Sequence, residues 1–394
     1  MIVSYNMAER ISNQENPMKS IKQLTAVSSL ALLGFGAAPT ASALDLTNIE
    51  GTAVPAPYVT YGDANSYSLP VLGILYEYYT DGTLSNSIQP SNPYYITSTP
   101  GAIKDLTVVG TGSSGGPVTT NYAGMDNAYP TPNSDGIPFF STGTTTDPGQ
   151  VSPFVGDQEN TWDIRLTALM DFTEGGAPVF FFNNNQTNSG DSADQNLAIW
   201  AALTLYDDDG IVGPHTFYFT NEGGAYALVS EGGGGDYMGT AGTGTAGGPS
   251  DPLAGTNAAT DYVLSGGALC YTAAFAAVSC DSPDSVGGPI NHNLGANQAV
   301  YAVVFPALND ILLTAGFLGY DVMSLDWRMG CDPATIDPAT NCIGRSLNNG
   351  YEQLFIGSIA VLPPPPNGVP EPATLALLGS ALLGFAAMRR RKQA

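Results

Sequence analysis

Positive charge is scarce in this chain of 394 residues. It has 11 lysines and arginines against 35 aspartates and glutamates, which gives a formal net charge of −24 at pH 7. Only four of the basic residues lie between Leu44 and Pro370, the stretch in which we expect the mature protein. A surface of this sign repels nucleic-acid phosphates, and divalent cations can relieve its self-repulsion. We therefore expect no nucleic-acid partner.

Histidine is equally scarce, and catalytic motifs are missing. His215 stands where a strand is expected to begin and His292 in a loop-like segment, so they form no H-E-x-x-H zinc motif. The GSSGGP segment resembles the nucleophile motif of chymotrypsin-like proteases around Ser114. However, Ser113 replaces the aspartate of that motif, and both histidines follow it in the chain. We therefore expect no catalytic residue.

The chain has only four cysteines, in two pairs that are close in sequence. Three pairings are possible, but the short spacing favours two local disulfides, each closing a loop of roughly ten residues. A zinc site of four thiolates is disfavoured, because neither pair has C-x2-4-C spacing. The expected disulfide residues are Cys270 with Cys280 and Cys331 with Cys342.

No apolar run is long enough to cross a membrane comfortably, and the two that come nearest lie at the ends. Near the N-terminus, Met18 is followed by two lysines, an apolar stretch at 27–38 and Ala41-Ser42-Ala43. This order is typical of a secretory signal peptide that signal peptidase removes after Ala43. We expect a signal peptide at 18–43, and we interpret residues 1–17 as an extension upstream of the true start.

The second apolar run lies at 373–388, after a proline-rich linker at 363–369 and the triplet Pro370-Glu371-Pro372. A helix of 16 residues spans about 24 Å, which is less than the roughly 30 Å of a bilayer core. We expect a short transmembrane helix here. The basic residues after it stay on the cytoplasmic side by the positive-inside rule, so the body lies outside. These residues are Arg389, Arg390, Arg391 and Lys392.

The segment 370–394 resembles the PEP-CTERM sorting signal of Gram-negative bacteria. The resemblance rests on the Pro-Glu-Pro triplet, the short Leu/Gly/Ala helix and the arginine-rich end. It implies export, transient anchoring in the membrane, cleavage near Pro370 by an exosortase, and release to the cell surface or the extracellular space. It implies nothing about the fold of the remaining chain.

The sequence of the body, residues 44–362, is typical of an all-β fold. Apolar runs alternate with clusters of turn residues, and the stretch 162–172 alternates apolar and polar side chains with period two. The apolar run 71–79 is also expected to be a strand. Pro306 and Gly316 bound one expected short helix. The sequence thus predicts a β-sandwich or jelly-roll-like body with long Gly/Pro-rich loops, such as 113–150 and 231–255.

One acidic turn is a candidate metal site. Asp207, Asp208 and Asp209 follow an expected strand, and an asparagine-rich segment occupies 183–196. Carboxylate and amide oxygens suit calcium, but the twelfth position counted from Asp207 is Tyr218 rather than the glutamate of an EF-hand loop. The pattern fits either a solvated acidic turn or a calcium site, so we expect either no cofactor or calcium.

Three functions remain open from sequence. The first is a non-enzymatic protein of the cell surface or extracellular matrix that binds polysaccharide or calcium. The second is a secreted hydrolase acting on polysaccharide, which needs only two facing carboxylates in a cleft. The third is a subunit that forms a surface lattice or filaments.

The terminal signals predict the mass of the mature protein. We expect protein isolated from its native cells to begin at Leu44 and to lack Arg389 to Lys392, because signal peptidase and exosortase remove both ends. Intact-mass spectrometry checks this directly. A mature protein that retains the four basic residues would contradict the predicted processing.

Overall fold

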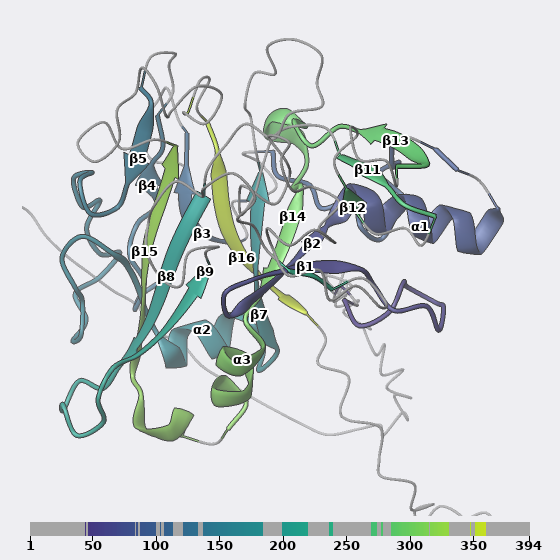
Figure 1. Cartoon of the computed structure of the whole chain (residues 1–394). Coiled ribbons are helices and arrows are strands. Elements are labelled where there is room, and N and C mark those ends of the chain that lie inside the picture. The colour runs from purple at the N-terminus through teal and green to yellow at the C-terminus, as the bar shows by residue number, and fades with distance from the viewer. Residues whose placement is uncertain are drawn as a thin grey trace, which may run out of the picture. The chain divides into compact units, whose positions relative to one another are not determined.

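A computed structural model gives the fold of the body (Figure 1). It describes residues 44, 46–82, 84–85, 87–99, 103, 106–112, 121–132, 137–183, 199–219, 236–238, 269–273, 277–278, 285–314, 316–330, 347 and 351–359. The expected signal peptide with Ala43, the linker and the sorting signal at 370–394 lie outside these residues. Within them, no helix has the length and apolar character needed to cross a membrane.

The largest sheet has eight strands. All neighbouring strands in it are antiparallel except β3 and β4, which are parallel. Its order is β10 (Asp236–Met238), β1 (Tyr58–Tyr61), β2 (Ala64–Ser68), β14 (Tyr301–Val304), β7 (Ala177–Asn183), β16 (Gln353–Ile359), β3 (Thr107–Thr111) and β4 (Tyr129–Pro130).

A second sheet has five strands, and a third has three; both are antiparallel. The second runs in the order β5 (Phe139–Ser141), β15 (Val322–Gly330), β8 (Ile199–Tyr206) and β9 (His215–Phe219), with β6 (Trp162–Arg165) pairing with β15. The third runs in the order β12 (Ala277–Val278), β11 (Leu269–Tyr271) and β13 (Gly287–Ile290).

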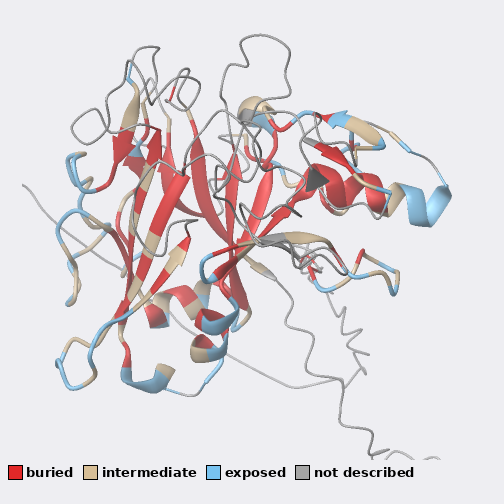
Figure 2. Ribbon diagram, viewed as in Figure 1, coloured by how far each residue is buried: buried red, intermediate tan, exposed pale blue. Residues whose placement is uncertain are grey.

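The eight-stranded sheet is buried on both faces, as its central strand β7 shows. Successive side chains of a strand point to opposite faces. Phe180 and Phe182 enter a core that includes residues of the five-stranded sheet, whereas Val179 and Phe181 enter a second core on the other face. Every residue of β7 is buried (Figure 2). A mostly β body is therefore confirmed.

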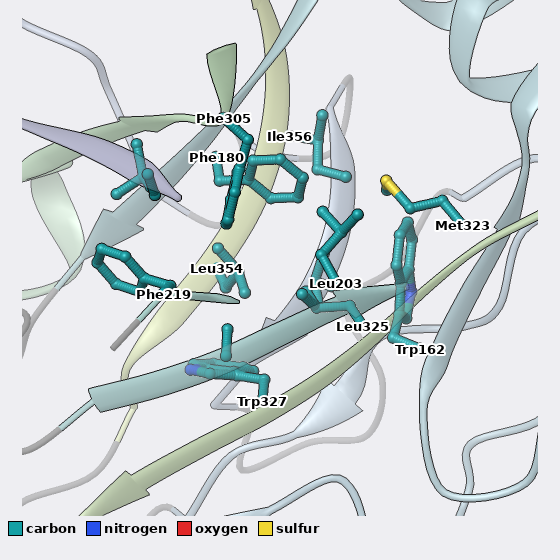
Figure 3. Packing of buried hydrophobic residues seen from close by; sticks show 14 of the residues in the cluster. Trp162, Phe180, Leu203, Phe219, Phe305, Met323, Leu325, Trp327, Leu354 and Ile356 are labelled. Carbon is teal, nitrogen blue, oxygen red and sulfur yellow. The ribbon is translucent and has the colours of Figure 1, made fainter. Parts of the chain in front are cut away.

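Aromatic side chains fill the core between the two larger sheets (Figure 3). The Trp327 ring of β15 lies 5.0 Å from that of Phe140 and 6.2 Å from that of Phe182, measured between centroids. Gly110 in β3 faces the same indole, and a Cβ at this position would collide with it. The close approach of the two sheets thus requires glycine at residue 110.

The predicted strand at 71–79 is wrong, because this segment is the helix α1 (Leu69–Asp81). Ser68 caps the helix by accepting a hydrogen bond from the backbone N–H of Val71, and a proline lies in the first turn. Gly82 ends it in the left-handed conformation, with φ of 78°. Seven consecutive residues from Leu69 to Leu75 are buried, and five of them belong to the second core.

The predicted strand at 162–172 is correct only as far as Arg165. The chain then forms the helix α2 (Leu166–Phe172), in which Leu166 and Leu169 are buried at helical spacing. The helix expected at 306–316 is confirmed as α3 (Pro306–Leu312), and it ends earlier than expected. The expectation of a single helix is therefore wrong. Two 3-10 turns, η3 (Gly295–Asn297) and η4 (Phe317–Gly319), complete the described elements.

His292 braces the start of α1. Its ring is fully buried, with Nδ1 2.9 Å from the Ile290 carbonyl oxygen and Nε2 2.7 Å from the Ser68 hydroxyl. Nδ1–H therefore donates to the carbonyl, and Nε2 accepts from Ser68. The carbonyl bond favours the charged form, but burial outweighs it and lowers the pKa of His292 to about 4. His292 is thus a neutral structural residue.

This burial predicts an acid sensitivity. The pKa of His292 is lower in the folded protein than in the unfolded chain, so its contribution to stability is present above pH 6.5 and is lost as the pH falls towards 4. We expect the free energy of unfolding of the wild type, relative to His292→Asn, to decrease by about 3 kcal/mol over this range. Urea unfolding of both proteins at each pH gives the difference. Parallel curves would contradict the assignment.

Candidate functional site

The first aspartate of the predicted acidic turn accepts hydrogen bonds from the backbone of the same turn. The Asp207 carboxylate accepts hydrogen bonds from the backbone N–H groups of Asp209, Ile211 and Val212, at 2.9, 2.7 and 2.7 Å. The bond from Val212 is the main cause of a lowered pKa of Asp207. Both oxygens of this side chain are therefore engaged by the turn that follows β8.

The other two aspartates of the turn diverge. Asp208 forms an ion pair with Arg165 at the end of β6, whereas Asp209 is exposed. Arg165 also donates to the Val155 carbonyl at 2.9 Å, which ties the turn to the loop before β6. Calcium binding at 207–209 stays a prediction. Of the asparagine-rich segment only Asn183 is described, and its amide donates to Ser98 and Gln353.

A different set of carboxylates comes together where the sequence predicted none. Asp126, Asp157 and Asp163 each offer one oxygen, and these oxygens lie within 4.8 Å of one another. Asp126 precedes β4, Asp157 lies in the loop before β6, and Asp163 is in β6. Two hydrogen bonds join Asp126 to Asp163. The N–H of Asp126 donates to the Asp163 carbonyl oxygen at 3.0 Å, and the N–H of Asp163 donates to Asp126 Oδ2 at 2.7 Å.

Two of these three carboxylates are deeply buried. Asp126 and Asp163 are each 0% exposed, and burial is the main cause of a pKa raised to about 9 for Asp126 and about 7 for Asp163. The negative charge of Asp163 raises the pKa of Asp126 further. The sequence pattern placed Asp163 on the outer face of its strand with Arg165. No local spacing connects it to Asp126, so only the fold reveals the group.

An open groove of about 610 Å³ lies beside α2. Its walls include Tyr122, Gly124, Arg165, Thr167, Asp171 and Phe172. Tyr122 is 50% exposed, and its ring centroid lies 6.5 Å from that of Phe172. The backbone N–H of Arg165 donates to the Gly124 carbonyl at 2.8 Å, so the groove is supported by the same two segments that carry Asp126 and Asp163.

The remaining candidate residues form no reactive group within the described part of the chain. His215 is exposed at the start of β9 and contacts the ring of Phe217, and Ser114 lies outside the described residues. Cys270 of β11 is disulfide-bonded. Its partner, which is Cys280, Cys331 or Cys342, also lies outside the described residues, so the pairing stays a prediction.

Comparison with known families gives the class of protein and then the family. Residues 368–392 match the PEP-CTERM protein-sorting motif, which implies an exported protein that is sorted at the cell envelope by an exosortase. Residues 50–328 match the family described as Domain of unknown function (DUF8239). The chain belongs to this family. No curated protein and no solved structure matches the chain.

Proposed function

We propose that this protein is a non-enzymatic component of the cell surface or extracellular matrix that binds a polysaccharide in the groove beside α2. The observation that carries the proposal is the half-exposed Tyr122 over an open groove, with Phe172 beside it. An aromatic ring can cover the apolar face of a sugar while polar side chains bond its hydroxyls. Thr167 and Asp171 supply such groups here.

The charge of the protein favours a neutral polysaccharide. With a net charge of −24 the chain repels an anionic polymer. The guanidinium of Arg165 does not offset this within the groove, because it pairs with Asp208 and lies 3.8 Å from Asp321. Asp171 adds a further negative charge to the wall. Binding therefore depends on stacking and hydroxyl contacts.

The groove supports binding better than hydrolysis. A glycosidase places two carboxyl groups on either side of the scissile bond. Among the described lining residues Asp171 is the one carboxylate, and the perturbed pair Asp126 and Asp163 is fully buried and out of reach of a substrate. The sorting motif fits either function, since it implies export to the compartment in which extracellular polymers lie.

The proposal predicts the effect of removing the aromatic side chain. We expect Tyr122→Ala to weaken binding to a neutral polysaccharide by about 1 kcal/mol, roughly fivefold in Kd, because the stacking face is lost. Tyr79→Ala is the matched control, since Tyr79 is 42% exposed on α1, away from the groove lining. Depletion assays with insoluble glucans and with polymer from the native cells measure the difference.

If both variants bind the polysaccharide equally and both retain the melting temperature of the wild type, the groove is not the binding site. Failure of the wild type to bind any neutral polymer would overturn it. Release of reducing sugar by the wild type, abolished in Asp171→Asn, would replace it with a hydrolase.

A further inference from the structure

The geometry points to a calcium site at Asp126, Asp157 and Asp163 that joins the loop before β6 to the body of the protein. This inference is independent of polysaccharide binding. It also uses none of the residues of the acidic turn at 207–209, which the sequence favoured for calcium.

The spacing of the carboxylates fits one ion. Calcium binds oxygen ligands at 2.3–2.6 Å, so two oxygens on opposite sides of one ion are about 5 Å apart at most. The three carboxylate oxygens lie within 4.8 Å of one another. They come from two stretches of the chain, one with Asp126 and the other with Asp157 and Asp163, so an ion between them would act as a tertiary cross-link.

Two of the carboxylates have a buried oxygen without a hydrogen-bond donor among the described residues. These atoms are Oδ1 of Asp126, a residue that is 0% exposed, and Oδ1 of Asp157. The hydrogen bonds that reach the group go to its other oxygens. Asp126 Oδ2 accepts from the Asp163 backbone, and Asp163 accepts from the Gln158 backbone at 3.0 Å and from the Thr161 hydroxyl. A buried, unpaired carboxylate oxygen is costly, and a cation would satisfy it.

No described basic side chain supplies that positive charge. Arg165 pairs with Asp208 and Asp321, and Arg328 pairs with Asp326. The chain itself is strongly acidic, with few basic residues to recruit. Within the described residues the three neighbouring carboxylates thus have no counter-charge, which a metal ion or a proton from solution would supply.

The ligand chemistry favours calcium over other metals. All three side chains offer hard oxygen ligands, and the group contains neither the imidazole nor the thiolate that zinc and copper prefer. Calcium accepts six to eight ligands in irregular geometry, whereas magnesium demands a near-ideal octahedron at about 2.1 Å. Asp157 is only partly buried, so water can complete the coordination from its side.

The loop that the ion would fasten is already shaped to lie against the body. Gly156 adopts φ of 93°, and a Cβ there would collide with Asp208 and Val322. Next to it, the Val155 carbonyl accepts from Arg165. Asp157 follows directly, and its carboxylate reaches Asp126 and Asp163.

The test uses the full exported protein after treatment with a chelator, titrated with calcium chloride by calorimetry and thermal melting. We expect one calcium ion per chain and a rise of several degrees in Tm. Asp126→Asn should raise the Kd for calcium by more than about tenfold. In chelator the same variant should melt no lower than the wild type, because the asparagine oxygen can still accept from the Asp163 N–H and the side chain brings no negative charge to the group. Asp209→Asn, in the acidic turn, is the matched control and should bind calcium like the wild type.

Several outcomes would overturn the site. One is a wild type whose Tm does not respond to millimolar calcium, which would leave a proton as the occupant. Another is a calcium response that survives in Asp126→Asn and disappears in Asp209→Asn, which would return the ion to the acidic turn. If Asp126→Asn fails to fold, terbium luminescence of wild type and Asp209→Asn decides. Trp162 precedes Asp163, so excitation of tryptophan should give emission that calcium displaces in both proteins, and no emission would contradict the site.

Discussion

The structure depends on the burial of both faces of the eight-stranded sheet. The strand β7 cannot leave either face in water, because its side chains are large and apolar on both sides. The five-stranded sheet covers one face, and α1 with the N-terminal segment of the body covers the other. The buried hydrogen bond between Ser68 and His292 fixes the start of α1, the helix that covers the second face.

The same burial explains why a highly acidic chain has carboxylates inside. Strand β6 pairs with β15, and its residues Trp162 and Ile164 must enter the core. Asp163 between them is thereby directed to the other side, where Asp126 and the loop before β6 cover it. In a protein with more basic residues an arginine could neutralise such a group. Here the described arginines pair with other aspartates, so among the described residues no side chain supplies the positive charge, and an ion from solution would do so.

The sequence allowed prediction of a mostly β body but not of every element in it, nor of the contacts between distant segments. The alternation from Trp162 to Arg165 was enough to predict β6. The run at 71–79 was wrongly predicted to be a strand, because continuous apolar character fits a buried strand and a buried helix equally. The signals that decide for a helix are Ser68 and Gly82 at its ends. Asp163 was assigned to solvent by alternation. Its partner Asp126 lies 37 residues away, a separation that no local pattern can detect.

The same pair of backbone segments holds the groove and the carboxylate group. The bond from Arg165 to the Gly124 carbonyl holds the groove wall, and the bond from Asp126 to the Asp163 carbonyl belongs to the same pair of segments. An ion bound to the carboxylates would therefore stiffen the backbone that presents Arg165 and the groove. Calcium sites of extracellular modules bind at about 10⁻⁴–10⁻³ M, concentrations that exist outside cells. Export, which the sorting motif implies, would thus deliver the protein to the compartment in which both sites can be filled.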